Sequence, residues 1–303
     1  MSLTLVATFA TALACPEQAS ALHAAAEVVE ARYFDAAKAR IIAQALSDEA
    51  DQLTECSPER HFLDSVNRML DAHDGHFLFE RPTSNDDADD WLTAWRADSV
   101  KVNAGVREVR LLEGNVGYLR LTSFYPWDLA GPKLRAAWDL LSEADALIID
   151  LRGNGGGEEV ATAKLARALL PETVESVQLI ESRGGRTADT LPSTDLPDTF
   201  RDKPLAILID RRSGSASEYL AYSLQALGRA RVIGSRSGGA ANLVGESRPL
   251  PNGYAISIPE ARPVNLTTGS NWEGAGVRPD VPGGDDPLHV ARKELEAMIA
   301  GRD

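Results

Sequence analysis

The chain has 303 residues, enough for one large domain with an appendage or for two modest domains. Apolar residues make up 44% and charged residues 25% of it, the balance of an ordinary globular protein. The formal net charge is −14 and the basic residues form no run, which argues against nucleic acid or an anionic membrane surface as a partner. No stretch reaches the roughly 18–20 apolar residues that cross a bilayer, so we expect no transmembrane segment.

The first residues have the character of an export signal. Residues 3–14, LTLVATFATALA, are apolar, end in Ala-Leu-Ala and precede Cys15. This pattern resembles the hydrophobic part and cleavage site of a secretory signal, although the positively charged start is missing; a first helix of the domain is the alternative. We expect residues 1–14 to be a signal-peptide remnant and the protein to be exported to the periplasm or extracellular space, with a cytoplasmic location as the alternative.

Whether the two cysteines can form a disulfide depends on where the protein is located. Cys15 and Cys56 are the only cysteines, too few for a disulfide scaffold. In an exported protein they can pair, and in a cytosolic protein they stay thiols. The sequence leaves the pairing open.

The next segment is helical. Apolar residues such as Leu22, Ala25 and Val29 recur at three- and four-residue steps, and this pattern continues to about residue 70. We predict an N-terminal helical domain over residues 15–80, and the sequence LDAHDGHFLFERP, residues 70–82, spans its end. Residues 81–105, which begin with an acidic, loop-like stretch, are predicted to be a linker.

Residues 106–303 have the pattern of an α/β core. Two strand-like runs flank Gly114-Asn115, a hairpin signal. Residues 146–170 and 204–227 then repeat one plan: an apolar strand, a turn of small residues and a helix. This recurrence predicts a parallel sheet buried on both faces, and an amphipathic helix closes the chain.

A glycine turn, DLRGNGGG, follows the first of these apolar strands. Its spacing fits neither a dinucleotide fingerprint nor a phosphate-binding loop. Glu158 and Glu159 occupy the start of the following helix, where they would repel a phosphate. Exposed backbone N–H groups here instead suit a peptide carbonyl or its oxyanion.

Three serines follow the second apolar strand. Ser213, Ser215 and Ser217 can each cap the next helix, which is the more common role of serine there. A serine between small residues at the end of a buried strand also resembles the strained turn that raises a nucleophile above a sheet.

A nucleophilic serine needs a base. His23, His61 and His289 lie in helical patterns, whereas His73 and His76 flank the break between helical and extended structure. A two-histidine metal site would lack a third ligand at suitable spacing, so we expect no metal. His76 follows a glycine in a turn and is the better candidate base.

Taken in order, the motifs DGH, DLRGNGGG, SGSASE and WEGAGVRPD resemble the tail-specific, or C-terminal-processing, serine peptidase family. The DGH motif is similar to the branch that contains the tricorn protease core and the interphotoreceptor retinoid-binding protein repeats. The resemblance covers about residues 70–285 and implies a ClpP/crotonase-like core of ββα units with a small N-terminal helical domain. Only about forty residues separate His76 from the strand at Gly117, so we expect no PDZ domain.

The resemblance also assigns roles to residues. It implies that Ser215 is the nucleophile, His76 the general base and Glu273 the acidic partner of the base. It places the oxyanion donors at the N–H groups of Gly155 or Gly156 and of Ala216.

At two positions this chain has a different residue from the catalytic residues of the families it resembles. The lysine-using branch would have its base at position 240, where this chain has Ala240, so no Ser–Lys dyad is available. The tricorn protease has a serine directly before its histidine, where this chain has Gly75. How Glu273 would reach His76 is therefore open.

We predict a serine peptidase that hydrolyses unfolded or short peptides through Ser215, His76 and Glu273, with no cofactor. A non-catalytic binder of apolar small molecules or peptides on the same fold is the main alternative. A crotonase-like acyl-CoA enzyme would use the same oxyanion turns but does not explain the DGH and EGAGV motifs. The substrate, the cleavage preference and the oligomeric state are left open by the sequence.

Overall fold

The computed structural model describes residues 15–82 and 87–301, without the side chains of 87–92. The chain divides into two compact units, Met1–Thr83 with Leu243–Ala261 (unit 1) and Ser84–Asn242 with Arg262–Asp303 (unit 2). The predicted signal remnant, residues 1–14, lies outside the described residues. Among the described helices, none combines the length and the apolar character that crossing a membrane requires.

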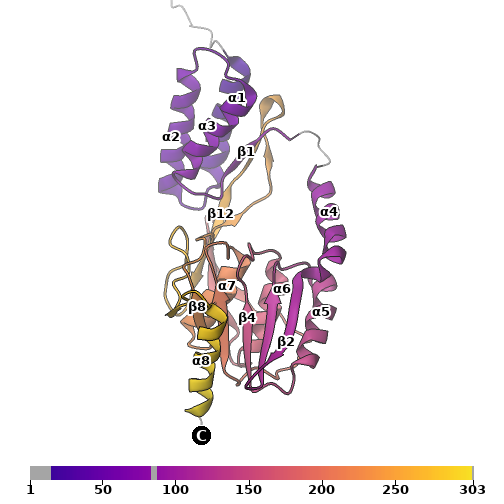
Figure 1. The fold of residues 1–303 in the computed structure, drawn as a ribbon. Helices are drawn as coiled ribbons and strands as arrows, with labels where there is room; N and C mark the ends of the chain where they lie inside the picture. Colours follow the sequence, from indigo (N-terminus) through magenta and orange to yellow (C-terminus); the bar gives the residue numbers. More distant parts are fainter. Residues whose placement is uncertain (1–14, 83–86, 302–303) are drawn as a thin grey trace, which may run out of the picture. The chain divides into compact units, whose positions relative to one another are not determined.

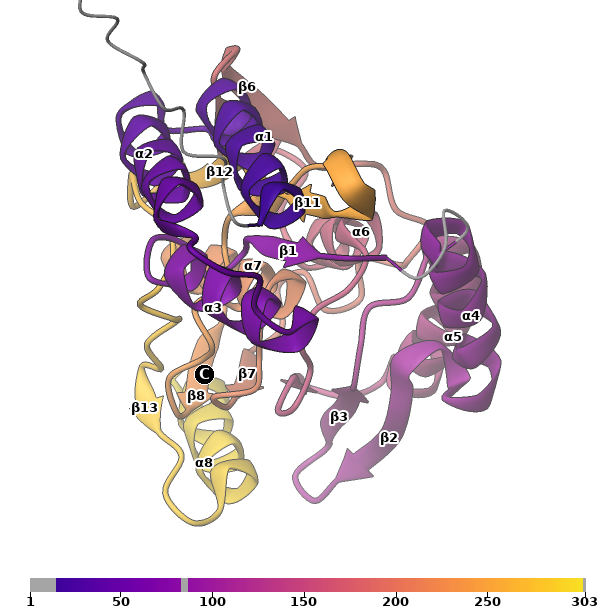
Figure 2. The same cartoon turned by 90° about the horizontal axis from the view of Figure 1, so that it is seen from above.

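Unit 1 contains three helices, α1 (Pro16–Arg32), α2 (Ala36–Gln52) and α3 (Glu59–Asp71). Asp35 begins α2 by accepting hydrogen bonds from the N–H groups of Ala37 (2.9 Å) and Lys38 (3.1 Å). The residues at the expected three- and four-residue steps, among them Leu22 and Val29, are fully buried in one core. The predicted helical character of this segment is thus present in the structure (Figure 2).

The core of unit 1 includes a second part of the chain. Strand β1 (Leu78–Glu80) pairs antiparallel with β11 (Ala255–Ser257), which in turn pairs with β10 (Arg248–Pro249). The short helix η2 (Pro251–Gly253) connects β10 to β11, and β9 (Leu243–Val244) pairs with the start of β12 (Pro259–Asn265). The segment Leu243–Ala261 adds four apolar side chains to the helical core, those of Leu250, Tyr254, Ile256 and Ile258.

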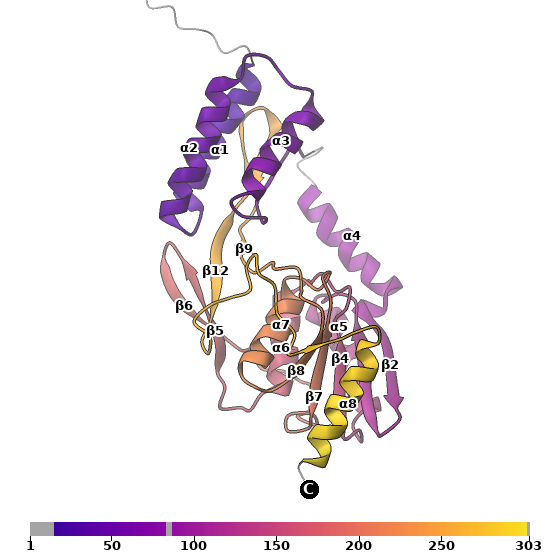
Figure 3. The ribbon, with the colours of Figure 1, turned by 60° about the vertical axis from the view of Figure 1, so that its left-hand side comes forward.

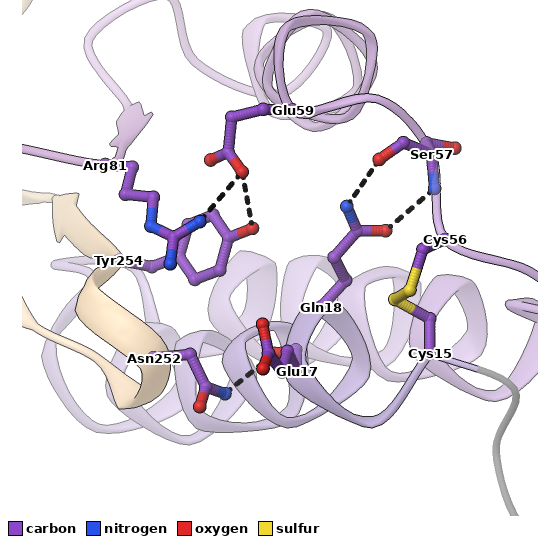
Figure 4. The surroundings of a disulfide bond; sticks show 9 residues. All are labelled: Cys15, Glu17, Gln18, Cys56, Ser57, Glu59, Arg81, Asn252 and Tyr254. Atoms are coloured by element: carbon purple, nitrogen blue, oxygen red, sulfur yellow. Dashed lines mark hydrogen bonds and ion pairs between the residues drawn. A yellow bond between two sulfur atoms is a disulfide. The ribbon is translucent and has the colours of Figure 1, made fainter.

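A disulfide joins Cys15, at the start of α1, to Cys56, just before α3. Next to it the Gln18 side chain donates to the carbonyl of Ser57 (2.8 Å) and accepts from the N–H of Ser57 (3.1 Å). Figure 4 shows both groups on the same side of α1. The disulfide and the amide pair hold the α2–α3 connection against α1.

Unit 2 is built on a six-stranded sheet in the order β13-β8-β7-β4-β3-β2 (Figure 1). The strands are β2 (Val106–Leu112), β3 (Val116–Leu121), β4 (Ala146–Asp150), β7 (Leu205–Ile209), β8 (Arg231–Gly234) and β13 (Val281–Pro282). β2 is antiparallel to β3, and all other neighbours are parallel. Gly114 and Asn115, both with positive φ, form the predicted turn between β2 and β3.

Both faces of this sheet are covered by helices. Leu147 and Ile149 of β4 belong to the core under α5 (Trp127–Leu140), α6 (Glu159–Leu169) and α7 (Ala216–Ala226). Ala146 and Ile148 of the same strand instead pack in the core under α8 (Pro287–Ala300). Figure 3 shows α6 and α7 on one side of the strands and α8 on the other. The predicted α/β class, with a sheet buried on both faces, is confirmed.

The segment predicted as a linker contains helix α4 (Asp87–Lys101) and the short helix η1 (Asn103–Gly105). Both belong to unit 2. Farther along the chain, β5 (Ser176–Ser182) and β6 (Gly185–Thr190) form an antiparallel hairpin beside β12.

Candidate active site

Three parallel strands, β4, β7 and β8, deliver their following loops to one edge of the unit 2 sheet. These loops contain the glycine turn, the three serines and residues 235–242. In an α/β sheet, the carboxyl ends of parallel strands are where ligands bind. Hydrogen bonds between the loops show that they form one structure.

The glycine turn after β4 is centred on Asn154, which is fully buried. Its side chain donates to the carbonyl of Leu121 (3.1 Å) and accepts from the N–H of Gly156 (2.9 Å). Its own carbonyl accepts from the N–H of Gly214 (3.0 Å) and from the hydroxyl of Ser217 (2.9 Å). Asn154 therefore fastens the glycine turn to the serine turn.

The three serines have different environments. Ser213 is fully buried, and its hydroxyl donates to the carbonyl of Leu151 (2.8 Å) and accepts from the N–H of Asp210 (3.0 Å). Ser217 is also fully buried and is bonded to Asn154. Ser215 alone of the three is exposed. The first and third serines build the turn, and the second presents its side chain.

Ser215 has an unusual backbone, with φ 50° and ψ −119°. A residue other than glycine in a sparsely populated region costs about 1–3 kcal/mol, and such residues cluster at functional sites. The surrounding hydrogen bonds hold this conformation. Its N–H donates to Glu218 Oε2 (2.9 Å), in the first turn of α7.

Glu218 is a fully buried carboxylate that joins two loops. Besides the N–H of Ser215, it accepts the N–H groups of Gly239 (2.6 Å) and Ala240 (2.8 Å) and the hydroxyl of Ser237 (2.5 Å). Four donors to one carboxylate satisfy a buried charge without a cation. The sequence contained this residue within SGSASE but did not show its role. The sequence pattern that could have indicated this role is a glutamate three residues after the serine that begins the helix.

The glycine turn contacts the serine turn closely. A Cβ on Gly156 would lie 2.8 Å from Ser215 Cβ and 3.0 Å from the nitrogen of Ala216, and φ of Gly156 is +113°. Among the described residues, the N–H groups of Gly155 and Ala216 donate to no protein acceptor, whereas that of Gly156 is bonded to Asn154. Two open N–H groups thus flank the exposed serine.

Glu273 lies in the turn before β13, and its Oε2 accepts the N–H groups of Ala241 (2.8 Å) and Asn242 (2.9 Å). Its neighbour Trp272 is buried and donates through its indole N–H to the carbonyl of Ala240 (2.9 Å). Glu273 therefore belongs to the same loop cluster of unit 2 as Ser215. Ala240, at the position of the other branch's lysine, contributes backbone groups to this cluster.

His76 lies in unit 1, after α3. Its Nδ1 is 3.0 Å from Oδ1 of Asp74, and the same oxygen accepts the His76 N–H (3.0 Å). Asp74 is buried, and its Oδ2 accepts the hydroxyl of Tyr33 (3.1 Å). Because a carboxylate only accepts, the Nδ1 carries a proton and Nε2 is the basic nitrogen of the neutral ring. Asp74 was not among the sequence candidates, although an aspartate two residues before a histidine is a simple turn signal.

The comparisons with known proteins agree with the resemblance read from the motifs. The family model of "Peptidase family S41" matches residues 115–282. A carboxy-terminal-processing protease of Bartonella bacilliformis is 32% identical over 191 residues, which cover 61% of this chain and 42% of that protein. That protein and four other curated relatives that match are longer than the matched region, which covers only 32% to 43% of their length.

Solved structures have the same fold. A lipoprotein from Streptococcus agalactiae is similar with a TM-score of 0.65 at 17% identity, covering 98% of this chain and 99% of that one. The tricorn protease is similar with a TM-score of 0.59 at 14% identity, covering 93% of this chain and 37% of that one. The resemblance to C-terminal-processing peptidases is confirmed, and the tricorn protease shares the fold. Because the family model matches more than half of the sequence, the chain belongs to peptidase family S41.

Proposed function

We propose that this protein is a serine peptidase in which Ser215 is the nucleophile. One observation carries the proposal: of three neighbouring serines only Ser215 is exposed, in a strained backbone conformation beside the unbonded N–H groups of Gly155 and Ala216. A strained, exposed serine with nearby amide donors is the arrangement that acyl transfer requires.

In the proposed reaction, Nε2 of His76 takes the proton from Ser215 Oγ while that oxygen bonds to the carbonyl carbon of the scissile peptide. The carbonyl oxygen becomes an oxyanion and accepts the N–H groups of Gly155 and Ala216. His76 then returns the proton to the departing amine as the C–N bond breaks, which leaves an ester on Ser215. Water, deprotonated by His76, hydrolyses this ester in the same way.

Asp74 and Glu273 have separate parts in the proposal. Asp74 fixes the tautomer in which Nε2 accepts, through its bond to Nδ1. Glu273 is the acidic partner that the motifs predict, and its charge would stabilise the imidazolium. The proposal requires that the folded chain brings His76 of unit 1 within hydrogen-bond distance of Ser215 of unit 2.

We further propose that the substrates are unfolded or short peptides and that the protein works outside the cytoplasm. The first point is supported by the carboxy-terminal-processing proteases among the relatives. The second is supported by the Cys15–Cys56 disulfide, because such bonds persist in oxidising compartments and are rare in the cytosol.

The test is a peptide-library cleavage assay with wild-type protein, Ser215→Ala and His76→Ala. Each substitution should lower kcat by about 10⁴-fold or more with little change in KM, because it removes chemistry rather than binding. A serine-reactive phosphonate should form an adduct on Ser215 of the wild type.

The matched controls are Ser193→Ala and His61→Ala, which replace exposed residues of the same units and should leave kcat unchanged. Cleavage that survives both active-site substitutions would show that other residues act. If the wild type cleaves no peptide but binds apolar ligands, the protein is a binder on this fold instead.

A further inference from the structure

A hollow of about 450 Å³ opens beside the glycine turn of unit 2. It is lined by one aromatic ring, one hydroxyl, the turn itself and one carboxylate: Trp95, Ser123, Gly155, Gly156, Gly157 and Glu158. Of these residues, only Gly155 takes part in the proposed chemistry.

The hollow adjoins the candidate oxyanion turn, because Gly155 and Gly156 belong to both. Gly156 approaches Ser215 so closely that an added Cβ would lie 2.8 Å from Ser215 Cβ. The hydroxyl of Ser123 donates to the carbonyl of Gly156 (3.1 Å), which fixes the other wall to the turn. A side chain in this hollow therefore belongs to a residue next to the scissile bond.

Trp95 supplies a flat, fixed apolar wall. Its ring stacks on Tyr125, with the centroids 5.1 Å apart and an angle of 23° between the planes. The hydroxyl of Tyr125 donates to Asp98 (3.2 Å), one turn of α4 after Trp95. An indole face held in this way can cover a methylene chain and attract a cation.

Glu158 supplies a negative charge at the same place. Its Oε2 caps α6 by accepting the N–H of Ala161 (2.8 Å). In the described part of the chain it forms no ion pair with a lysine or arginine. The nearby guanidinium of Arg96 is instead paired with the carboxylate of Asp128, to which it donates from both terminal nitrogens. The carboxylate of Glu158 is therefore not neutralised by a bonded cation.

We propose that this hollow binds the side chain of a lysine or arginine flanking the scissile bond, with its methylene stem on Trp95 and its charge near Glu158. Long basic side chains combine an apolar stem with a cationic end, which matches an indole next to a carboxylate. The inference rests on the proposed peptidase function and names its substrate class.

The test compares peptides that differ only at the residue flanking the cleaved bond: lysine, arginine, norleucine and glutamate. The wild type should cleave the lysine and arginine peptides about 10-fold faster in kcat/KM than the norleucine peptide, and the glutamate peptide slowest. Glu158→Gln keeps an oxygen that can cap α6. It should reduce kcat/KM for the lysine peptide about 10-fold and leave the norleucine peptide unchanged.

Glu172→Gln is the matched control, because it removes the same charge from an exposed site beyond the other end of α6. It should leave every rate unchanged. Trp95→Ala should lower kcat/KM for both lysine and norleucine peptides, and Trp95→Phe should restore part of it.

A binding measurement separates this inference from the proposed function. Calorimetry with Ser215→Ala should show tighter binding of the lysine than of the norleucine peptide, and Glu158→Gln in that background should remove the difference. If wild type cleaves peptides without this preference, the hollow does not select basic residues although the peptidase function stands. If nothing is cleaved but the binding difference is present, the hollow selects basic residues and the peptidase function fails. Equal binding of the two peptides would overturn the inference.

Discussion

Burial distinguishes Ser215 from the serines two positions before and after it. All three are equally compatible with a helix cap in the sequence, and the motif resemblance alone singled out the middle one. In the structure, Ser213 and Ser217 are fully buried and bonded to the carbonyls of Leu151 and Asn154, whereas Ser215 is exposed. The hydrogen bonds of this turn to Asn154 and Glu218 could not be predicted from the sequence, because they depend on which loops meet in the folded chain.

Gly156 should not tolerate a side chain. A Cβ at Gly156 meets Ser215 Cβ, the carbonyl of Gly214 and the nitrogen of Ala216 at 2.8 to 3.0 Å, at φ +113°. Gly156→Ala should therefore displace the serine turn and lower kcat/KM about 100-fold. The same loss should appear in the rate of labelling of Ser215 by a phosphonate.

Gly184→Ala is the control, because it adds the same methyl group to an exposed turn of unit 2, where its Cβ would meet only Ser182 Oγ, at 3.6 Å. It should fold normally and keep the activity. If the two variants lose activity equally, the contact between Gly156 and the serine turn is not what sets the geometry.

Individual strands and turns were the features best predicted. Apolar runs in the sequence predicted β4 and β7, and the pair Gly114-Asn115 predicted the turn between β2 and β3. The alternation of β4, with Ile148 toward α8 and Ile149 toward α5–α7, follows from the period of two in a strand. Helix α4 was not expected, because the acidic start of its segment looks like a loop.

One buried polar group connects β3 and β4. The hydroxyl of Tyr118 donates to Asp150 (2.7 Å), whose carboxylate also accepts from the guanidinium of Arg152. Burial opposes ionisation of Asp150, but the bonds from Arg152 and Tyr118 outweigh it and hold its pKa below the usual value. Burial, together with the bond to Asp150, raises the pKa of Tyr118 to about 12.

Stability should fall at alkaline pH in a way that depends on Tyr118. A pKa raised in the folded state gives stability that is complete below the ordinary tyrosine value near 10 and is lost as pH rises toward about 12. Tyr118→Phe should make the free energy of unfolding less dependent on pH in this window and lower it at pH 7, where Asp150 loses a donor. Urea denaturation at several pH values measures both effects.

The comparison variant is Tyr222→Phe, whose hydroxyl is bonded to Thr268 rather than to a carboxylate. It should lower the free energy of unfolding at pH 7 less than Tyr118→Phe does, because no buried carboxylate loses a donor. An unchanged slope in Tyr118→Phe would mean that Tyr118 does not titrate there.

At the scale of the whole molecule, the two units differ in how they are built from the chain. We expected a helical domain limited to residues 15–80, whereas unit 1 also contains Leu243–Ala261. The pattern of short strands and turns around residue 250 gave no sign of this, because antiparallel pairing with β1 depends on a partner about 175 residues earlier. The resemblance, which rests on the order of the motifs, did not predict that residues 243–261 belong to unit 1.

The disulfide should matter mainly to unit 1. It closes a loop between residues 41 positions apart, and such a bond stabilises a fold by about 2–4 kcal/mol. The double substitution Cys15→Ser/Cys56→Ser should lower the temperature at which unit 1 unfolds and speed hydrogen exchange in α1. Hydrogen exchange read by mass spectrometry reports each unit separately.

Reduced wild-type protein should behave like the double variant, and the amides of unit 2 should exchange as before. Faster exchange spread evenly over both units would contradict a local role for the bond.

The interleaving of unit 1 has a consequence for how the protein is made. A ribosome that has released only the first 83 residues has produced three helices and β1, but not Leu250, Tyr254, Ile256 or Ile258, which complete their core. Translation must pass residue 261 before this unit can close, by which point the serine turn has already been synthesised. Ser215 is therefore synthesised before the core of the unit that contains His76 is complete, and the proposed pairing of these two residues has to wait until residue 261 has been made.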